Sequence, residues 1–291
     1  MSAKTIESVT TETTAHPDRN LRPLGFTVLA LVISLVSVVP LIWVVSTSLK
    51  TGAEVTAAPL ALPTALNWDN YPRAWEQGRF GTYFVNSVVV SAVVVIGVLV
   101  LSLMAAYAFA LMKFRGRTLL FVYFLVGLTI PLSVLVIPIF YQMLELKLLS
   151  TLWALILPQI ATGLPFGILL LRSFIRDIPS EILDAARVDG CSRIRMLLHI
   201  VTPLTRPALL SLLIFNFMWS WNQFMLPSFL IQQDSMRTLP AGLRFFIGRY
   251  SNDIPLLMAG ATISFLPILI VYVIFQRQFI QGISAGALSG Q

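Results

Sequence analysis

The sequence predicts an all-α, polytopic membrane protein with six transmembrane helices. Hydrophobic residues make up 57% of the chain's 291 residues. Charged residues make up only 11%, against about 25% in a typical soluble domain. Six separate segments are apolar over about 20 residues or more, the length that a helix needs to cross a bilayer. This composition excludes an ordinary cytosolic enzyme, a disordered protein and a fibrous repeat.

The six predicted spans share one property, the absence of Lys, Arg, Asp, Glu and His. They are residues 24–48, 83–112, 119–140, 152–171, 207–229 and 255–276. The first exceeds the apolar core of about 7–15 residues that a cleaved signal peptide carries, so we expect a retained anchor. Four prolines interrupt the third and fourth spans: Pro131, Pro138, Pro158 and Pro165. Broken backbone at membrane depth is tolerated where it is buried in protein or lines a cavity, which indicates a bundle.

The distribution of positive charge predicts the orientation of the chain. With both termini in the cytoplasm, thirteen of the twenty Lys and Arg residues are cytoplasmic and seven lie outside. Lys and Arg accumulate in cytoplasmic loops, so we expect cytoplasmic tails at residues 1–23 and 277–291 and an extracytoplasmic loop at 49–82. The same bias accounts for the net charge of +7, which therefore does not indicate a nucleic-acid partner.

The spans lack the titratable residues that power ion-coupled transport, and the chain lacks the common nucleotide-binding and catalytic motifs. Ion-coupled carriers place titratable residues within their spans, and here the spans have none. The chain contains no G-x-x-x-x-G-K-[ST] phosphate loop and no HExxH, CxxC or GxSxG motif. Its only cysteine, Cys191, excludes an intrachain disulfide. We therefore expect a non-enzymatic protein, either a translocation pathway or a scaffold, without a metal or cofactor of its own. A partner protein is expected to supply the energy.

Residues 172–206 form a long predicted cytoplasmic segment between the fourth and fifth spans. Ser180 is expected to cap a helix that Gly190 ends in a left-handed conformation. Ser192 is expected to cap a second helix that ends at Pro203. The segment is therefore a short helical hairpin.

The first helix of this hairpin carries a small apolar stripe. Ile182, Ala185 and Ala186 stand at positions i, i+3 and i+4. Such a stripe, flanked by charges, suits docking into a groove on another protein. The alternative is a hairpin that lies on lipid headgroups with the help of its arginines.

The hairpin sequence is similar to a family motif. The string Glu181-Ile-Leu-Asp-Ala-Ala-Arg-Val-Asp-Gly190, followed by Ile200-Val-Thr-Pro203, resembles the EAA loop of type I ATP-binding-cassette import permeases. Asp184 stands where that motif has Glu, Cys191 where a small residue is usual, and Thr202 where Leu precedes the Pro.

Other strings place the likeness in the oligosaccharide class, over about residues 24–290. They are Asn67-Trp-Asp-Asn-Tyr71 ahead of Asn86-Ser87, Ala105-Ala-Tyr-Ala-Phe-Ala followed by Phe114-Arg-Gly116, Trp221-Asn-Gln-Phe-Met-Leu-Pro227, and Gln276-Arg-Gln-Phe-Ile-Gln-Gly-Ile-Ser-Ala-Gly286-Ala. The last resembles the tail of the MalG-like permease of maltose-type importers.

The resemblance implies a permease core at residues 83–276 with a coupling segment at 172–206. It implies a heterodimer with a second homologous permease subunit, on two ATPase subunits that bind ATP and Mg. An extracytoplasmic solute-binding protein then delivers a sugar. In this family the EAA helix fits a cleft on an ATPase subunit. The residues that match are Glu181, Asp184, Ala185, Ala186, Arg187, Asp189 and Gly190.

Polar residues in the spans are candidates for the translocation pathway. Asn216, Ser220 and Gln223 recur at i, i+4 and i+7 of an otherwise apolar helix. Aromatic rings stack on sugars, and amides bond their hydroxyls. The alternative is an aromatic belt at the membrane interface and hydrogen bonds between helices. The candidates are Asn86, Ser87, Asn216, Trp219, Ser220, Asn222, Gln223, Thr262 and Ser264.

Together these features predict the permease subunit of an ATP-driven sugar importer in the cell membrane. One alternative is a permease of the same superfamily for another solute, such as a glycerol phosphate; the scarcity of basic residues near mid-membrane weighs against an anion. A second is a membrane scaffold or channel component without a transport cycle. For a third, an intramembrane enzyme, the sequence offers no catalytic constellation.

Overall fold

The computed structural model describes residues 24–247 and 253–288, and in these residues the regular structure is helical, without a β-strand. The chain divides into two units, residues 1–43 and 44–291. The predicted N-terminal tail, residues 1–23, lies outside the described residues. The all-α class predicted from the sequence is confirmed.

Helix α1 (Leu24–Ser48) carries the first unit and is apolar on all sides. Two of its polar side chains are bonded within the helix: Ser34 and Ser37 each donate from Oγ to the carbonyl four residues earlier, at 2.8 Å. A helix that is apolar all round suits the lipid interior.

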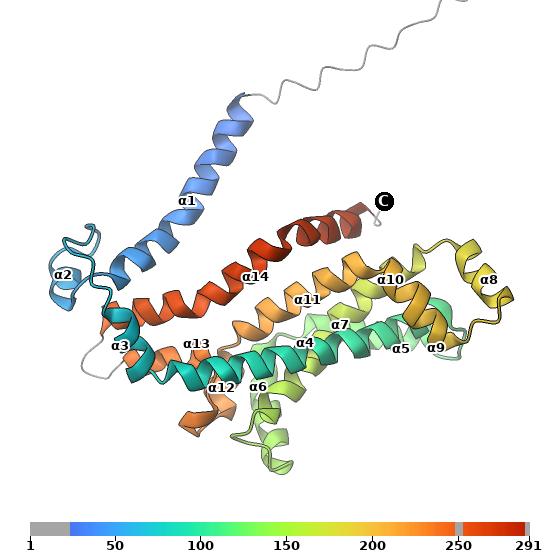
Figure 1. Cartoon of the computed structure of the whole chain (residues 1–291). Coiled ribbons are helices and arrows are strands. Elements are labelled where there is room, and N and C mark those ends of the chain that lie inside the picture. The colour runs from blue at the N-terminus through green and yellow to red at the C-terminus, as the bar shows by residue number, and fades with distance from the viewer. Residues whose placement is uncertain (1–23, 248–252, 289–291) are drawn as a thin grey trace, which may run out of the picture. The chain divides into compact units, whose positions relative to one another are not determined.

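The second unit is a bundle built around helix α4 (Phe80–Leu111). Helices α7 (Trp153–Arg176) and α11 (Arg206–Trp221) pack along α4, and α14 (Ile254–Leu288) packs on α11. Figure 1 shows the short helices α8 and α9 at one end of this bundle and α3 and α13 at the other. The bundle therefore has two distinct ends, joined by long helices.

Glycines set the distance between α4 and α7. A Cβ on Gly167 would overlap Ser102 Oγ, and one on Gly97 would lie 2.6 Å from Ile160 Cδ1. Lipid tails are as apolar as leucine, so membrane helices associate mainly through such close packing at small residues. The α4–α7 contact thus depends on glycine at these positions, because a side chain there would force the two helices apart.

The third predicted span is broken. Helix α5 (Arg117–Val126) and the 3₁₀ turn η1 (Gly127–Thr129) are followed by α6 (Leu132–Glu145), and the chain bends by 104° between the two parts. Ile130 is extended, as expected for a residue before proline, and Pro131 has no N–H to continue the helix. The sequence predicted an interruption of the third span at its prolines, and the break lies at Pro131, whereas Pro138 lies within α6. The fourth span, which was also expected to be interrupted, is one helix that contains Pro158 and Pro165.

The number of spans agrees with the sequence when this bent pair counts as one. Five helical segments in the described residues are long and apolar enough to cross a membrane, and the bent pair makes up to six. The fifth is interrupted, because α11 ends at Trp221 and α12 (Met225–Leu230) follows. The last helix continues to Leu288, beyond the expected end of the span at residue 276.

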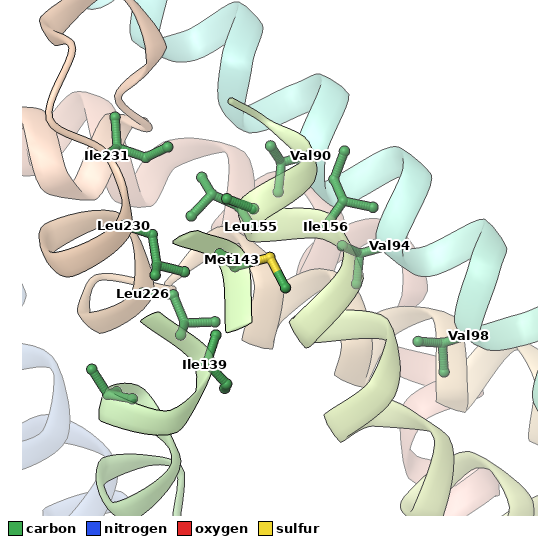
Figure 2. Close-up of a cluster of buried hydrophobic side chains, with 12 residues drawn as sticks. Val90, Val94, Val98, Ile139, Met143, Leu155, Ile156, Leu226, Leu230 and Ile231 are labelled. Atoms are coloured by element: carbon green, nitrogen blue, oxygen red, sulfur yellow. The ribbon is translucent and has the colours of Figure 1, made fainter. Parts of the chain in front are cut away.

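One apolar cluster holds the second half of the broken span in the bundle. Ile139 and Met143 of α6 pack with Leu155 of α7 and with Leu226 and Leu230 of α12 (Figure 2). Val90, Val94 and Val98 of α4 complete the same cluster. The bend at Pro131 is therefore fixed by packing on three other helices.

The loop at residues 49–82, predicted to be the outer loop, is held together by polar contacts. The amide of Asn70 donates to the carbonyls of Ser48 and Lys50, each at 2.8 Å. The buried ammonium of Lys50 donates to the carbonyls of Ala58 and Pro59, at 3.2 and 3.0 Å. The loop contains helices α2 (Gly52–Ala57) and α3 (Asn70–Gln77).

Glu54 links Thr51 and Thr64 in the first part of this loop by hydrogen bonds. Its carboxylate accepts from the Thr51 amide at 2.8 Å, from the Thr64 hydroxyl, and from the Thr64 amide at 3.0 Å. These bonds, the one from the Thr51 amide foremost, lower the pKa of Glu54 from 4.5 to about 2.

We predict that a Gly167→Ala variant is less stable than the wild type by about 1–3 kcal/mol, because the new methyl overlaps Ser102. Thermal unfolding of the purified protein measures the loss. Adding Ser102→Gly should restore part of it. Gly52→Ala is the control, since its Cβ meets nothing within 4 Å. Equal stability of the two alanine variants would contradict the close contact.

We predict that the outer loop loosens in acid. Because the folded-state pKa of Glu54 is depressed, its contribution is complete above pH 4.5 and is lost as the pH falls towards about 2. Hydrogen exchange at the Thr51 and Thr64 amides should show this loss of protection. In Glu54→Gln the pH dependence should flatten, whereas Glu76→Gln on α3 should leave it unchanged. An unaltered profile in Glu54→Gln would refute the assignment.

Candidate functional site

The predicted cytoplasmic hairpin is a helical hairpin in the structure. Its first helix, α8 (Ser180–Val188), ends before Gly190, which has a φ of 72° in the left-handed region where glycine is favoured. Ser180 is not the cap: Pro179 occupies that position without a side-chain bond, and Ser180 is the first helical residue. A proline already favours the extended backbone of a cap, which moves the start by one residue.

The second half of the hairpin is a chain of short helical turns. Ser192 caps α9 (Arg193–Met196) by accepting from the Arg195 amide, as predicted. A π turn, η2 (Leu197–Val201), and the short α10 (Thr202–Leu204) follow. The helical backbone therefore runs through Pro203 to Leu204 rather than ending at Pro203, because a proline in the first turn lacks only an N–H that has no partner there.

The apolar stripe on α8 is divided between two environments. Ala186 is buried and packs with Leu183 into the bundle's own core. Ile182 and Ala185 are exposed, and the neighbouring Val188 is 87% exposed. Of the three residues in the expected docking stripe, Ala186 thus anchors α8 to the bundle, and Ile182 and Ala185 are open to a partner.

The charged residues predicted for coupling lie on the exposed surface of the hairpin. Asp184 forms an ion pair with Arg187 one turn later, with both side chains more than half exposed. Glu181 in the first turn and Arg187 in the last complement the helix dipole. Asp189 and Gly190 are exposed at the turn. The structure leaves their coupling role a prediction.

A second feature is a cavity of about 200 Å³ within the bundle. It lies between α4, η1, α7 and α11. Three pathway candidates line it: Asn216, Trp219 and Ser220. Gly163 lies beside Asn216, whose Oδ1 stands only 2.8 Å from where a Cβ of that glycine would be. The spacing of Asn216, Trp219 and Ser220 along α11 thus brings their side chains to the same cavity.

Sequence reasoning missed the opposite wall of this cavity. Gln159 and Thr162 of α7 line it, together with Phe166. The available signal was a polar pair at i and i+3 in the fourth span, next to Pro158. A single helix pattern could not show that this pair faces α11.

Asn222 and Gln223 line a neighbouring hollow of about 510 Å³, which shares Phe215 and Trp219 with the first cavity. The Gln223 side-chain oxygen accepts from the amides of Met225 and Leu226 at 3.1 and 3.4 Å. These two bonds satisfy backbone N–H groups at the start of α12, so Gln223 holds the interruption of the fifth span in place.

The remaining pathway candidates bond to backbone. The Asn86 amide donates to the carbonyls of Ser235 and Arg237 at 2.9 and 2.8 Å, and Ser87 Oγ accepts from the Leu239 amide at 2.8 Å. Thr262 and Ser264 donate to carbonyls of their own helix. These four side chains do not line the 200 Å³ cavity, and their part in transport stays a prediction.

Apolar spans thus pack around an uncharged, mostly apolar cavity that contains a few amide and hydroxyl side chains, and a polar hairpin lies at one end of the bundle. Residues 99–285 match the family described as "Binding-protein-dependent transport system inner membrane component". The chain belongs to this family. It is therefore a multi-pass inner-membrane transport component.

Two named relatives cover nearly the whole chain. The sequence is 35% identical over 274 residues to the diacetylchitobiose uptake system permease protein NgcG of Streptomyces coelicolor, covering 94% of this chain and 90% of that protein. It is 35% identical over 262 residues to the arabinooligosaccharides transport system permease protein AraQ of Halalkalibacterium halodurans, covering 89% and 93%.

The fold also matches a solved structure. A chain of a bacterial ABC transporter involved in the import of the acidic polysaccharide alginate superposes with a TM-score of 0.77 at 24% identity. The match covers 91% of this chain and 100% of that chain. The likeness establishes the permease fold.

Proposed function

We propose that this permease forms half of the translocation pathway for a sugar or short oligosaccharide in an ATP-binding-cassette importer. The observation that carries the proposal is the cavity in the bundle, where amide and hydroxyl side chains meet aromatic rings without a charged residue in the lining. Sugars are recognised by this combination. The names of NgcG and AraQ, both oligosaccharide permeases, support the same substrate class.

The hairpin is proposed to couple the permease to ATP hydrolysis. Leu183 and Ala186 fasten α8 to the bundle, while Ile182 and Ala185 are open to a partner. A helix held on one side and apolar on the other suits a groove on an ATPase subunit. ATP and Mg are then bound by two such subunits, and the chain itself takes no cofactor and catalyses no reaction.

The complete importer is proposed to contain a second homologous permease and an extracytoplasmic solute-binding protein. Both termini and the hairpin face the cytoplasm, in keeping with the thirteen Lys and Arg residues assigned to that side. The loops at residues 49–82 and 230–254 face the binding protein. A membrane scaffold without a transport cycle would not need an internal cavity with amide and hydroxyl side chains in its lining.

Ala185→Arg is predicted to uncouple the importer. Because Ala185 is exposed, an arginine leaves the bundle intact but obstructs the docking face. A clash of about 1.4 kcal/mol lowers affinity about tenfold. ATP hydrolysis by the assembled complex, stimulated by the loaded binding protein, should fall accordingly.

Ala57→Arg, a change of the same size on the exposed end of outer helix α2, is the matched control for this test. It should keep normal hydrolysis. Full stimulation in Ala185→Arg would refute the docking role of the hairpin.

Asn216→Leu is predicted to impair sugar uptake while the complex still assembles. The change keeps the approximate size of the side chain and removes its polar group from the cavity. Loss of one hydrogen bond to substrate lowers uptake at limiting sugar about three- to tenfold. Ser34→Ala on α1, outside the cavity lining, is the comparison and should transport normally. Equal uptake by both variants would remove Asn216 from the pathway.

A further inference from the structure

The cavity between α7 and α11 has the size of a subsite rather than of a site for a whole oligosaccharide. Its volume is about 200 Å³, below the ~300–1,000 Å³ usual for drug-sized ligands. This is room for about seven water molecules at ~30 Å³ each. Such a space suits a single sugar ring. Trp219, which is 66% exposed, stands at its border with the neighbouring hollow.

Three polar side chains of the cavity lining each use one hydrogen-bond donor within their own helix. The Gln159 amide nitrogen donates to the Leu155 carbonyl at 3.0 Å, and the Asn216 amide nitrogen donates to the Leu212 carbonyl at 2.9 Å. The Thr162 hydroxyl donates to the Pro158 carbonyl at 2.9 Å. The oxygens of these three side chains, and the second N–H of each of the two amides, are therefore left for a ligand.

Two oxygen atoms of the lining residues are buried without a partner among the described residues. They are Gln159 Oε1 and Ser220 Oγ, on side chains that are 94% and 93% buried. An unpaired buried polar group is costly, and native structures keep few of them without a reason. A ligand that donates hydrogen bonds would satisfy both atoms.

The lining also lacks the means to hold an anion. None of its ten residues carries a charge, and an unpaired charge in such surroundings is strongly unfavourable. The amide N–H and hydroxyl groups of the lining can donate to a carboxylate, but no Lys or Arg is present to balance its charge. A neutral sugar ring donates to the unpaired oxygens from its hydroxyls and brings no unpaired charge into the cavity.

We infer that this cavity is a subsite for one uncharged sugar ring and rejects acidic sugars. The inference rests on the proposed function and adds a substrate preference to it. It distinguishes this chain from the fold relative whose transporter imports acidic alginate.

The test compares sugars that differ only in a carboxylate. The chain has a single cysteine, so Cys191→Ser gives a background without thiols into which Thr162→Cys is introduced. The assembled complex is treated with the small reagent methyl methanethiosulfonate, with glucose or glucuronate and with galactose or galacturonate. Modification of this chain is followed by mass spectrometry. Ser228→Cys on α12, outside the cavity lining, is the control.

The expected result is that at least one neutral sugar slows modification at position 162 and its acidic partner does not, while position 228 is unaffected. Adding Gln159→Leu should raise the half-protecting concentration about three- to tenfold without lowering thermal stability. Equal or better protection by the acidic sugar overturns the inference, as does the absence of protection by either neutral sugar. ATP-driven uptake of labelled oligosaccharide by the unmodified importer is measured in parallel. Uptake without protection refutes the subsite alone, whereas loss of both refutes the proposed function.

Discussion

The close contact between α4 and α7 is the constraint on which the rest of the bundle depends. Glycines at 97, 163 and 167 bring α7 near α4 and α11, and substituents there would collide with Ile160, Val98, Asn216 or Ser102. The α4–α7 pair then supplies the valines and leucines that hold α6 and α12, so the broken third span has a fixed place. In a bilayer this geometry must come from shape, because the hydrophobic effect does not drive helices together there.

The spans could be predicted from sequence because lipid excludes charge, and an uncharged apolar run of about 20 residues is typical of a membrane-spanning helix. The direction of the chain inside an apolar run could not be predicted from the sequence. Residues 119–140 are continuously apolar, yet the chain bends by 104° around Ile130 and Pro131. Proline shows where a helix can break, while the size of the bend is decided by the helices that receive α6.

The candidate site was partly predictable for a related reason. Asn216 and Ser220 share a helix face, so their spacing along the chain is enough to place them together. Gln159 belongs to another helix, and its position opposite them is a result of packing that no local pattern contains. Asn86 shows that a polar residue in a span does not by itself identify a substrate contact. A polar residue in a span can bond a distant backbone segment, here the carbonyls of Ser235 and Arg237, as well as a substrate.

The hairpin and the cavity are joined by one packed core. Leu183 and Ala186 of α8 pack in the same cluster as Ala208 and Leu212, which lie on α11. From Ala208 the helix rises roughly 12 Å, at ~1.5 Å per residue, to Asn216 at the cavity. Well-packed interiors shift between discrete arrangements more readily than they deform. A partner that displaces α8 therefore acts on the helix that carries Asn216 and Ser220, which is the physical requirement for coupling an exposed hairpin to a site inside the membrane.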